Sequence, residues 1–247
     1  MACEACKTIP PVVAEGYVEK GNWEDVGGLK TYVTGNLLSK KAIVDVYDIF
    51  GPAPQTLQGA DALATALDIL VVVPDFFKGS PMLGEWYTSP TEESEKLKAA
   101  FFGKAFDFPQ ATKDLLDFTA AAKSKWSQVS SWGAFGLCWG GKVVVLTSAE
   151  STPFTASGQV HPGKMEIADA KALVIPHIVL ASNGEPEDVV KEYHDLLVGE
   201  GKPNVVETYG TMHHGWMGAR AKLEEDANLK EYTRGYNQLA AFFEKHL

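Results

Sequence analysis

The residues most suited to catalysis surround a cysteine that is flanked by glycines near the middle of the chain. The segment from Gly136 to Gly141 reads Gly-Leu-Cys-Trp-Gly-Gly and links an apolar run to a helix-compatible run. A nucleophile on a sharp strand-to-helix turn needs glycines two positions before and after it, because larger residues would hold the strand and the helix apart. Amides at the start of the helix would favour a thiolate and an oxyanion. The pattern predicts that Cys138 is a nucleophile, and the alternative is a small buried residue in a glycine-rich turn.

Two later segments could supply the acid and the histidine that such a nucleophile needs, in the chain order nucleophile, acid, histidine. Glu185 and Asp188 follow an apolar run that ends at Ala181, and His213 and His214 follow the next such run. Acids before a helix are also common partners of the helix dipole, and a histidine in a loop is commonly solvated. Because the three segments come at successive strand ends, we predict a Cys-His-acid triad.

The elements that must position these residues are short β-branched runs alternating with segments of helical spacing. Such an alternation is typical of an α/β fold, so we expect a mostly parallel central sheet with helices on both faces. Ligands collect at the carboxyl ends of the strands in such a sheet. We expect strands at 30–34, 42–47, 69–73, 132–137, 177–181 and 204–208, and helices at 58–67, 92–101, 111–123, 142–149, 186–197 and 228–246.

Composition narrows the possible functions. The 247 residues carry 22 Lys and Arg against 32 Asp and Glu, so the formal net charge is −10, and an acidic surface repels nucleic acid. The apolar content predicts one domain over residues 1–247, with residues 1–15 as an extended N-terminal segment. No apolar run reaches the roughly 18 residues of a membrane span, and no signal or transit pattern is visible, so we expect a cytoplasmic protein without membrane contact.

The three cysteines differ in their surroundings. Cys3 and Cys6 form a Cys-x-x-Cys pair near the start of the chain, without a second pair or a nearby histidine. A zinc or redox site there has little support, so we expect neither a metal nor a cofactor. Cys138 is the remaining thiol, and it lies between two expected elements.

Together these motifs resemble the dienelactone hydrolases, which are carboxymethylenebutenolidase-like α/β-hydrolases, and in particular their fungal members. The resemblance implies the α/β-hydrolase fold and the hydrolysis of an ester or lactone. It covers most of the chain, and its motifs are Asp48-Ile49-Phe50-Gly51, Pro74-Asp75-Phe76-Phe77, the segment from Gly136 to Gly141, His161-Pro162, the acid loop and His214-Gly215-Trp216.

The resemblance also implies roles for the catalytic residues. Cys138 would be the nucleophile, and His214 would be the general base and acid, because the family pattern has the catalytic histidine directly before a glycine, which excludes His213. The family spacing favours Glu185 as the triad acid, and Asp188 stays open as the alternative.

Further roles follow from the same resemblance. The backbone amides of Ile49 and Trp139 would form the oxyanion hole. Asp48 would modulate the nucleophile, since a like charge beside a thiolate raises its pKa, and the alternative is that Asp48 only braces its own loop. The resemblance and the aromatic content of the loops give the expected substrate contacts, which are Lys78, Trp216 and Arg220.

We therefore predict a hydrolase that cleaves a small-molecule ester or lactone through a thioester acyl-enzyme, as a monomer or a homodimer. The alternative is a non-catalytic protein of the same fold that binds a ligand in an aromatic-rich pocket. The two differ in the reactivity of the Cys138 thiol, which only an intact triad would raise.

Overall fold

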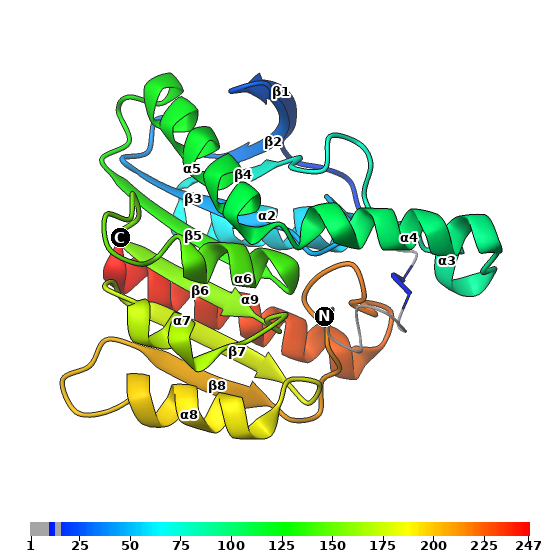
Figure 1. The fold of residues 1–247 in the computed structure, drawn as a ribbon. Helices are drawn as coiled ribbons and strands as arrows, with labels where there is room; N and C mark the ends of the chain where they lie inside the picture. The colour runs from blue at the N-terminus through cyan, green and yellow to red at the C-terminus, as the bar shows by residue number, and fades with distance from the viewer. Residues whose placement is uncertain (1–9, 13–15) are drawn as a thin grey trace.

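The computed structural model describes residues 10–12 and 16–247, and an eight-stranded sheet forms its centre (Figure 1). The strand order is β1-β2-β4-β3-β5-β6-β7-β8. β2 pairs antiparallel with both of its neighbours, and every pair from β4 to β8 is parallel, so β2 alone runs against the others. The mostly parallel sheet expected from the sequence is confirmed. The strands are β1 (Asn22–Val26), β2 (Leu29–Gly35), β3 (Lys41–Val46), β4 (Leu70–Pro74), β5 (Ser131–Leu137), β6 (Ala156–Val160), β7 (His177–Ser182) and β8 (Val205–Tyr209).

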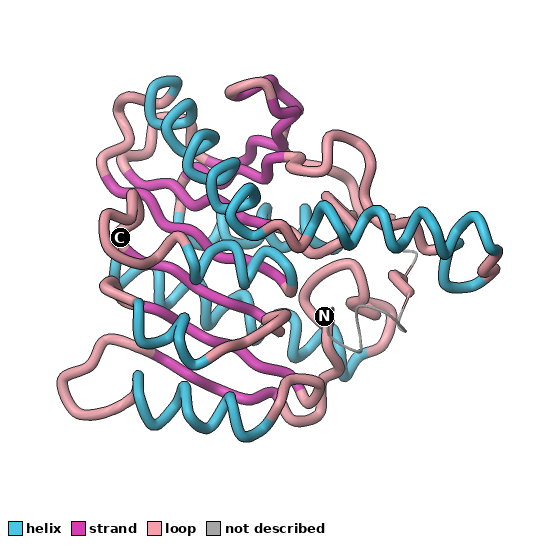
Figure 2. The backbone as a smooth tube through the Cα atoms, viewed as in Figure 1, coloured by secondary structure: helices cyan, strands magenta, loops and turns pink. Residues whose placement is uncertain are grey.

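Helices cover both faces of the sheet, as expected (Figures 1 and 2). On one face α2 packs against α9, and on the other α5 packs against α6, with α7 and α8 continuing that layer toward β8. The helices are α2 (Pro54–Leu67), α3 (Glu85–Thr88), α4 (Glu92–Ala105), α5 (Phe108–Lys125), α6 (Trp139–Leu146), α7 (Ile167–Ala172), α8 (Glu187–Leu197) and α9 (Asp226–His246).

Several boundaries differ from the sequence prediction for identifiable reasons. α2 begins at Pro54 and not near residue 58, because a proline fits the first helical turn, where its missing N–H is not needed. β1 was not predicted, since its sequence Asn-Trp-Glu-Asp-Val is polar and largely exposed at the sheet edge. β6 was not predicted either, because Ala-Ser-Gly-Gln-Val contains no β-branched run, although all five residues are buried.

The carboxyl ends of the parallel strands gather at one edge of the sheet. In Figure 1 the arrowheads of β6, β7 and β8 point to the same side, where the loops that follow them lie. This edge carries the segments after β3, β5, β7 and β8 in which the sequence places its candidate site residues.

Some expectations concern residues outside this description. Cys3, Cys6 and most of the expected N-terminal segment at 1–15 lie outside the described residues, and the single domain over 1–247 stays a prediction. Among the helices that the structure does describe, none combines the length and the apolar character needed to cross a membrane.

Candidate active site

Cys138 occupies the sharp turn between β5 and α6. Its backbone has φ 53° and ψ −107°, a conformation that residues with a Cβ rarely adopt. Glycines make the turn possible: a Cβ on Gly136 would lie 2.1 Å from the backbone of Gly140, and a Cβ on Gly140 would lie 1.9 Å from the carbonyl oxygen of Val46. The two glycines are therefore required by close backbone contacts, as the strand-turn-helix pattern predicts.

The end of β6 and the loop after it hold the Cys138 backbone from both sides. The N–H of Cys138 donates to the carbonyl oxygen of Val160 at 3.0 Å, and the carbonyl oxygen of Cys138 accepts from the N–H of Gly163 at 2.9 Å. Gly163 also lies beside the thiol, since a Cβ there would be 3.6 Å from Sγ. Cys138 is fully buried, so the thiol is shielded from bulk water in this structure.

His214 and Glu185 form a buried pair. Glu185 Oε1 lies 2.6 Å from Nδ1 of His214, and the two side chains are only 1% and 2% exposed. Ser182 holds the carboxylate in place, because its N–H donates to Oε2 and its hydroxyl donates to Oε1. The loops carrying the two residues are tied together by a hydrogen bond from the N–H of Asn183 to the carbonyl oxygen of Met212 at 2.9 Å.

The neighbouring candidates are placed differently. Asp188 lies exposed in the first turn of α8, where its charge favours the positive end of the helix dipole. His213 points away from the pair, and its Nε2 lies 3.0 Å from the carbonyl oxygen of Arg220, to which it donates. Burial lowers the pKa of His213. The structure thus brings Glu185, and not Asp188, to His214.

Asp48 braces two loops at once. Its Oδ1 accepts from the N–H of Phe50 and its Oδ2 from the N–H of Ala219, both at 2.9 Å. Burial raises the pKa of Asp48, and the positive charge of Arg220 and the two amides oppose that rise. The bracing considered from the sequence is therefore present, and Asp48 also lies near enough to His214 for the two charges to interact.

Arg220 and Lys78, both expected to contact substrate, lie in contrasting environments. The Arg220 guanidinium is fully buried, 4.7 Å from the ring centre of Phe50, and its charge acts on Asp48. Lys78 is exposed in the loop after β4, where it lines a cavity of about 470 Å³. A guanidinium buried beside a carboxylate is electrostatically balanced, whereas Lys78 is accessible to a ligand.

The same 470 Å³ cavity brings aromatic residues beside the nucleophile turn. Its wall includes Phe76, Phe77, Trp86 and Phe101, together with the side chain of Trp139, which directly follows Cys138. The Trp139 ring lies 4.7 Å from that of Phe77, measured between ring centres. Apolar aromatic walls of this kind suit an apolar part of a small ligand.

The structure does not place Trp216 among the substrate contacts expected from the sequence. It was expected among the substrate contacts, but it is fully buried and stacks on Tyr209 with ring centres 4.4 Å apart. Its other side packs against α9, where a Cβ on Gly235 would lie 2.6 Å from the indole. Trp216 therefore fills the core behind the histidine loop, because that loop folds back under α9.

The two expected oxyanion-hole residues lie at neighbouring strand ends. Ile49 opens the loop after β3, and Trp139 is the first residue of α6 after β5, the strand that pairs with β3. Both residues are buried. Their backbone amides are thus carried by adjacent strands on the edge that holds Cys138.

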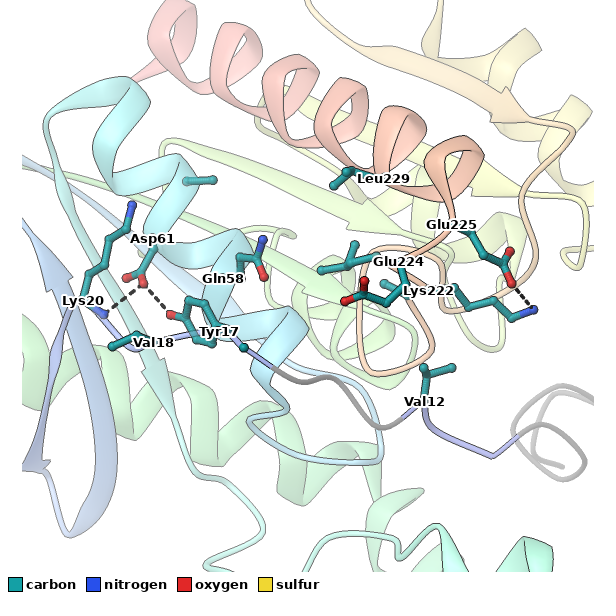
Figure 3. A pocket seen from close by; sticks show the side chains of 14 residues that line it. Val12, Tyr17, Val18, Lys20, Gln58, Asp61, Lys222, Glu224, Glu225 and Leu229 are labelled. Carbon is teal, nitrogen blue, oxygen red and sulfur yellow. Dashed lines mark hydrogen bonds and ion pairs between the residues drawn. The ribbon is translucent and has the colours of Figure 1, made fainter.

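A second cavity, of about 880 Å³, lies apart from these residues and is shown in Figure 3. It is lined by parts of α2, the segment before β1 and the loop before α9. Its most buried charge is Asp61, which accepts hydrogen bonds from Tyr17, Tyr32, Thr34 and the backbone N–H of Lys20. This carboxylate is therefore engaged by the protein itself and is not available to a ligand in the cavity.

Comparison with known proteins places the chain in a family. The sequence pattern of the Dienelactone hydrolase family matches residues 29–247. This chain belongs to that family. It is 32% identical over 229 residues to an uncharacterized AIM2 family protein of Schizosaccharomyces pombe, a match that covers 90% of each chain.

Solved structures agree on the fold of this dienelactone hydrolase family member. The dienelactone hydrolase of Anabaena variabilis superposes with a TM-score of 0.62 at 16% identity, covering 93% of this chain and 98% of that one. The Pyrococcus furiosus esterase Pf2001 gives a TM-score of 0.61 at 13% identity, covering 96% and 98%. The α/β-hydrolase fold expected from the sequence is confirmed, and through its family the chain is an ester or lactone hydrolase.

Proposed function

We propose that this protein hydrolyses a small ester or lactone through Cys138, with His214 and Glu185 completing a Cys-His-acid triad. The observation that carries the proposal is the buried 2.6 Å contact between Glu185 Oε1 and His214 Nδ1. A carboxylate that accepts from Nδ1 keeps the proton on that nitrogen and leaves Nε2 to accept a proton from the nucleophile. The strained turn at Cys138 and the family membership support the same assignment.

The first half of the reaction forms a thioester. Nε2 of His214 takes the proton from Sγ of Cys138, and the thiolate attacks the carbonyl carbon of the substrate. The backbone amides of Ile49 and Trp139 stabilise the oxyanion, and the start of α6 adds its dipole. The tetrahedral intermediate then expels the alkoxide, which takes the proton from His214. In a lactone this alcohol stays attached to the acyl group.

The second half regenerates the enzyme. His214 takes a proton from water, and the resulting hydroxide attacks the thioester carbon through a second tetrahedral intermediate. The carbon–sulfur bond breaks, a carboxylic acid leaves, and the thiolate of Cys138 recovers its proton from His214. The cycle therefore needs water alone as co-reactant.

Asp48 is proposed to modulate the thiol within this cycle. A negative charge near Cys138 opposes thiolate formation, whereas a protonated Asp48 does not. Burial favours the protonated form of Asp48, and its bonds to Phe50 and Ala219 favour the ionised form. A substrate that disturbs either loop would shift this balance and with it the readiness of the thiol.

The aromatic cavity supports an apolar substrate part. It borders Trp139 and is rimmed by the exposed Lys78 and by Lys104. We propose that it takes an apolar portion of the ester and that Lys78 attracts a polar or anionic edge of the same molecule. Arg220 is proposed only as an indirect contributor, through Asp48 and Phe50.

The deciding experiment compares wild type with Cys138→Ala on lactones, aryl esters and thioesters. We expect turnover to disappear in Cys138→Ala, and we expect mass spectrometry of quenched wild type to show the acyl group on the peptide that contains Cys138. Because the chain also contains Cys3 and Cys6, the modified peptide must be identified. Wild-type rates in Cys138→Ala would overturn the proposal.

Thiol alkylation separates catalysis from ligand binding without turnover. An activated Cys138 should react with iodoacetamide faster than an ordinary thiol, and His214→Ala should slow that reaction. A non-catalytic binding protein would show neither effect. The oligomeric state, monomer or homodimer, and the cytoplasmic location stay predictions from the sequence.

A further inference from the structure

His161 is a buried histidine that the proposed mechanism does not use. It follows β6 directly, it is fully buried, and neither ring nitrogen has a hydrogen-bond partner among the residues that the structure describes. Its backbone adopts φ 36°, in the left-handed region, and is held there by a 2.7 Å hydrogen bond from its N–H to the carbonyl oxygen of Leu180. The ring is thus fixed in position but unsatisfied.

Other buried histidines of this protein have partners. His177 is equally buried, yet Nδ1 lies 2.7 Å from the hydroxyl of Ser157 and Nε2 lies 3.1 Å from Oε1 of Gln159. His214 is paired with Glu185. Buried polar groups are normally hydrogen-bonded, and leaving one without a partner costs stability. The unsatisfied nitrogens of His161 therefore point to a partner that binds from outside the described chain.

The location of His161 indicates what that partner is. Its ring centre is 5.2 Å from that of His214, in an edge-to-face arrangement. The residues on either side of its loop, Val160 and Gly163, hold the Cys138 backbone, and Gly163 also lies beside Sγ. A molecule held between Cys138 and His214 would therefore lie close to the loop that carries His161.

The charge of the surroundings indicates the chemistry of the partner. Burial holds the pKa of His161 well below its ordinary value, and the positive charge of Arg220, like that of His214 when protonated, lowers it further, so the ring is neutral. Glu185 already lies against His214, and the positive charge of Arg220 already acts on Asp48. A neutral imidazole offers one N–H donor and one nitrogen acceptor, which suits an uncharged hydroxyl better than a carboxylate.

We propose that His161 is a specificity-determining residue that hydrogen-bonds an uncharged hydroxyl on the substrate, next to the ester group attacked by Cys138. The inference rests on the proposed function, since it places the substrate between Cys138 and His214. It narrows the substrate class to hydroxylated esters or lactones.

The test compares γ-butyrolactone with its 2-hydroxy and 3-hydroxy derivatives as substrates of wild type, His161→Phe and His161→Asn. Phenylalanine keeps an aromatic ring against His214 and removes both nitrogens. Asparagine keeps a donor and an acceptor, and it tolerates positive φ. The quantity measured is the ratio of kcat/KM for a hydroxylated lactone to that for the parent. Any general damage to the triad lowers both rates and cancels in this ratio.

We expect His161→Phe to lower the ratio by about 2- to 12-fold for at least one hydroxylated lactone, the contribution of one neutral hydrogen bond, and His161→Asn to restore part of it. If turnover is too slow to measure, calorimetry gives the Kd of each lactone for Cys138→Ala with and without the His161 substitutions. The ratios of these Kd values are then compared in the same way. Equal ratios in wild type and His161→Phe would overturn the inference. If the preference that depends on His161 were larger for a carboxylated lactone than for a hydroxylated one, the proposal that the bound group is uncharged would be overturned.

Different results would refute the proposed function and the role of His161. Lactone hydrolysis that persists in Cys138→Ala would refute the proposed function. Hydrolysis that depends on Cys138 but gives an unchanged ratio in His161→Phe would refute only the role of His161.

Discussion

Replacing Glu185 with glutamine tests the buried pair with His214 at nearly constant size. In the structure Oε1 of Glu185 accepts from His214 Nδ1 at 2.6 Å, and Oε2 accepts from the N–H of Ser182. Both positions require an acceptor, but a glutamine amide has one oxygen and one NH₂ group. In Glu185→Gln, either the imidazole or the Ser182 amide must therefore lose its acceptor.

The expected size of the effect follows from these contacts. A hydrogen bond to a charged group contributes about 1.5–3 kcal/mol, and a buried donor left without a partner costs about 1–3 kcal/mol. Together they amount to roughly 2.5–6 kcal/mol, which at about 1.4 kcal/mol per factor of ten lowers kcat/KM by about 10²- to 10⁴-fold. A rotated imidazole would regain a bond, but it would present a protonated nitrogen to Cys138 and would also be inactive.

The assay is steady-state hydrolysis of 4-nitrophenyl acetate near pH 7, with thermal unfolding measured on the same samples. Asp188→Asn is the matched control, since it makes the same change at an exposed acid in the first turn of α8. We expect its rate to stay within about twofold of wild type, as is usual for surface substitutions. A folded Glu185→Gln that keeps more than a tenth of the wild-type rate, or a larger loss in Asp188→Asn, would refute the reasoning.

Two further predictions concern the framework of the site. In Gly140→Ala the new Cβ would lie 1.9 Å from the carbonyl oxygen of Val46, so we expect a lower urea midpoint of unfolding and a loss of activity. Gly103→Ala is the control, because its Cβ meets nothing within 4 Å. It should leave activity unchanged and add up to about 1 kcal/mol to the free energy of unfolding. An unchanged midpoint in Gly140→Ala would contradict this. Asp45 is buried, neither carboxylate oxygen has a hydrogen-bond partner within the described chain, and burial, then Asp48, holds its pKa well above the ordinary value. The folded protein keeps a proton that the unfolded chain releases above about pH 4, so stability falls as pH rises from there toward the folded pKa. Asp45→Asn cannot ionise at this position, so its free energy of unfolding should rise relative to wild type by about 1.4 kcal/mol per pH unit in that window. Urea unfolding that shows a constant difference in this free energy between the two proteins from about pH 4 to 6 would contradict the prediction.

The parallel centre of the fold could be predicted because buried strands leave a clear signature in the sequence. β4, for example, reads Leu-Val-Val-Val-Pro and is buried at every residue. Strands covered on both faces appear as continuous apolar runs, and the helices between them show 3.6-residue spacing. The glycines around Cys138 were equally readable, because steric crowding at a strand-to-helix turn leaves few other choices.

β6 could not be predicted, because its stability depends on partners that are distant in sequence. Its buried polar residues Ser157 and Gln159 are satisfied by His177 of the neighbouring strand β7. Unless that pairing is known, a segment that contains a Gln and lacks a run of β-branched residues does not suggest a buried strand. Because the sequence predicts no strand directly before His161, it does not place this residue at a strand end and assigns it no role.

The choice between Glu185 and Asp188 depended on a turn that the sequence left open. After β7 the chain turns so that the N–H and hydroxyl of Ser182 both reach the Glu185 carboxylate. α8 then begins at Glu187, which places Asp188 on its exposed first turn. Helix start and carboxylate position are thus linked, because Glu185, two residues before the helix, can fold back to the strand end and Asp188 within the helix cannot.

In the proposed mechanism, the buried charges of the site keep the Cys138 thiol from being permanently ionised. Glu185 and Asp48 are both buried carboxylates near the site, and while His214 is neutral the charge of Arg220 acts against that of Asp48, so a thiolate at Cys138 would add a further negative charge to a buried region. The amides and dipole at the start of α6 offset part of that cost. Transfer of the thiol proton to His214 offsets more, because the resulting imidazolium lies 2.6 Å from Oε1 of Glu185 and also interacts with the charge of Asp48. We therefore expect the thiolate to form together with the imidazolium when substrate arrives, which protects a buried thiol from oxidation between turnovers.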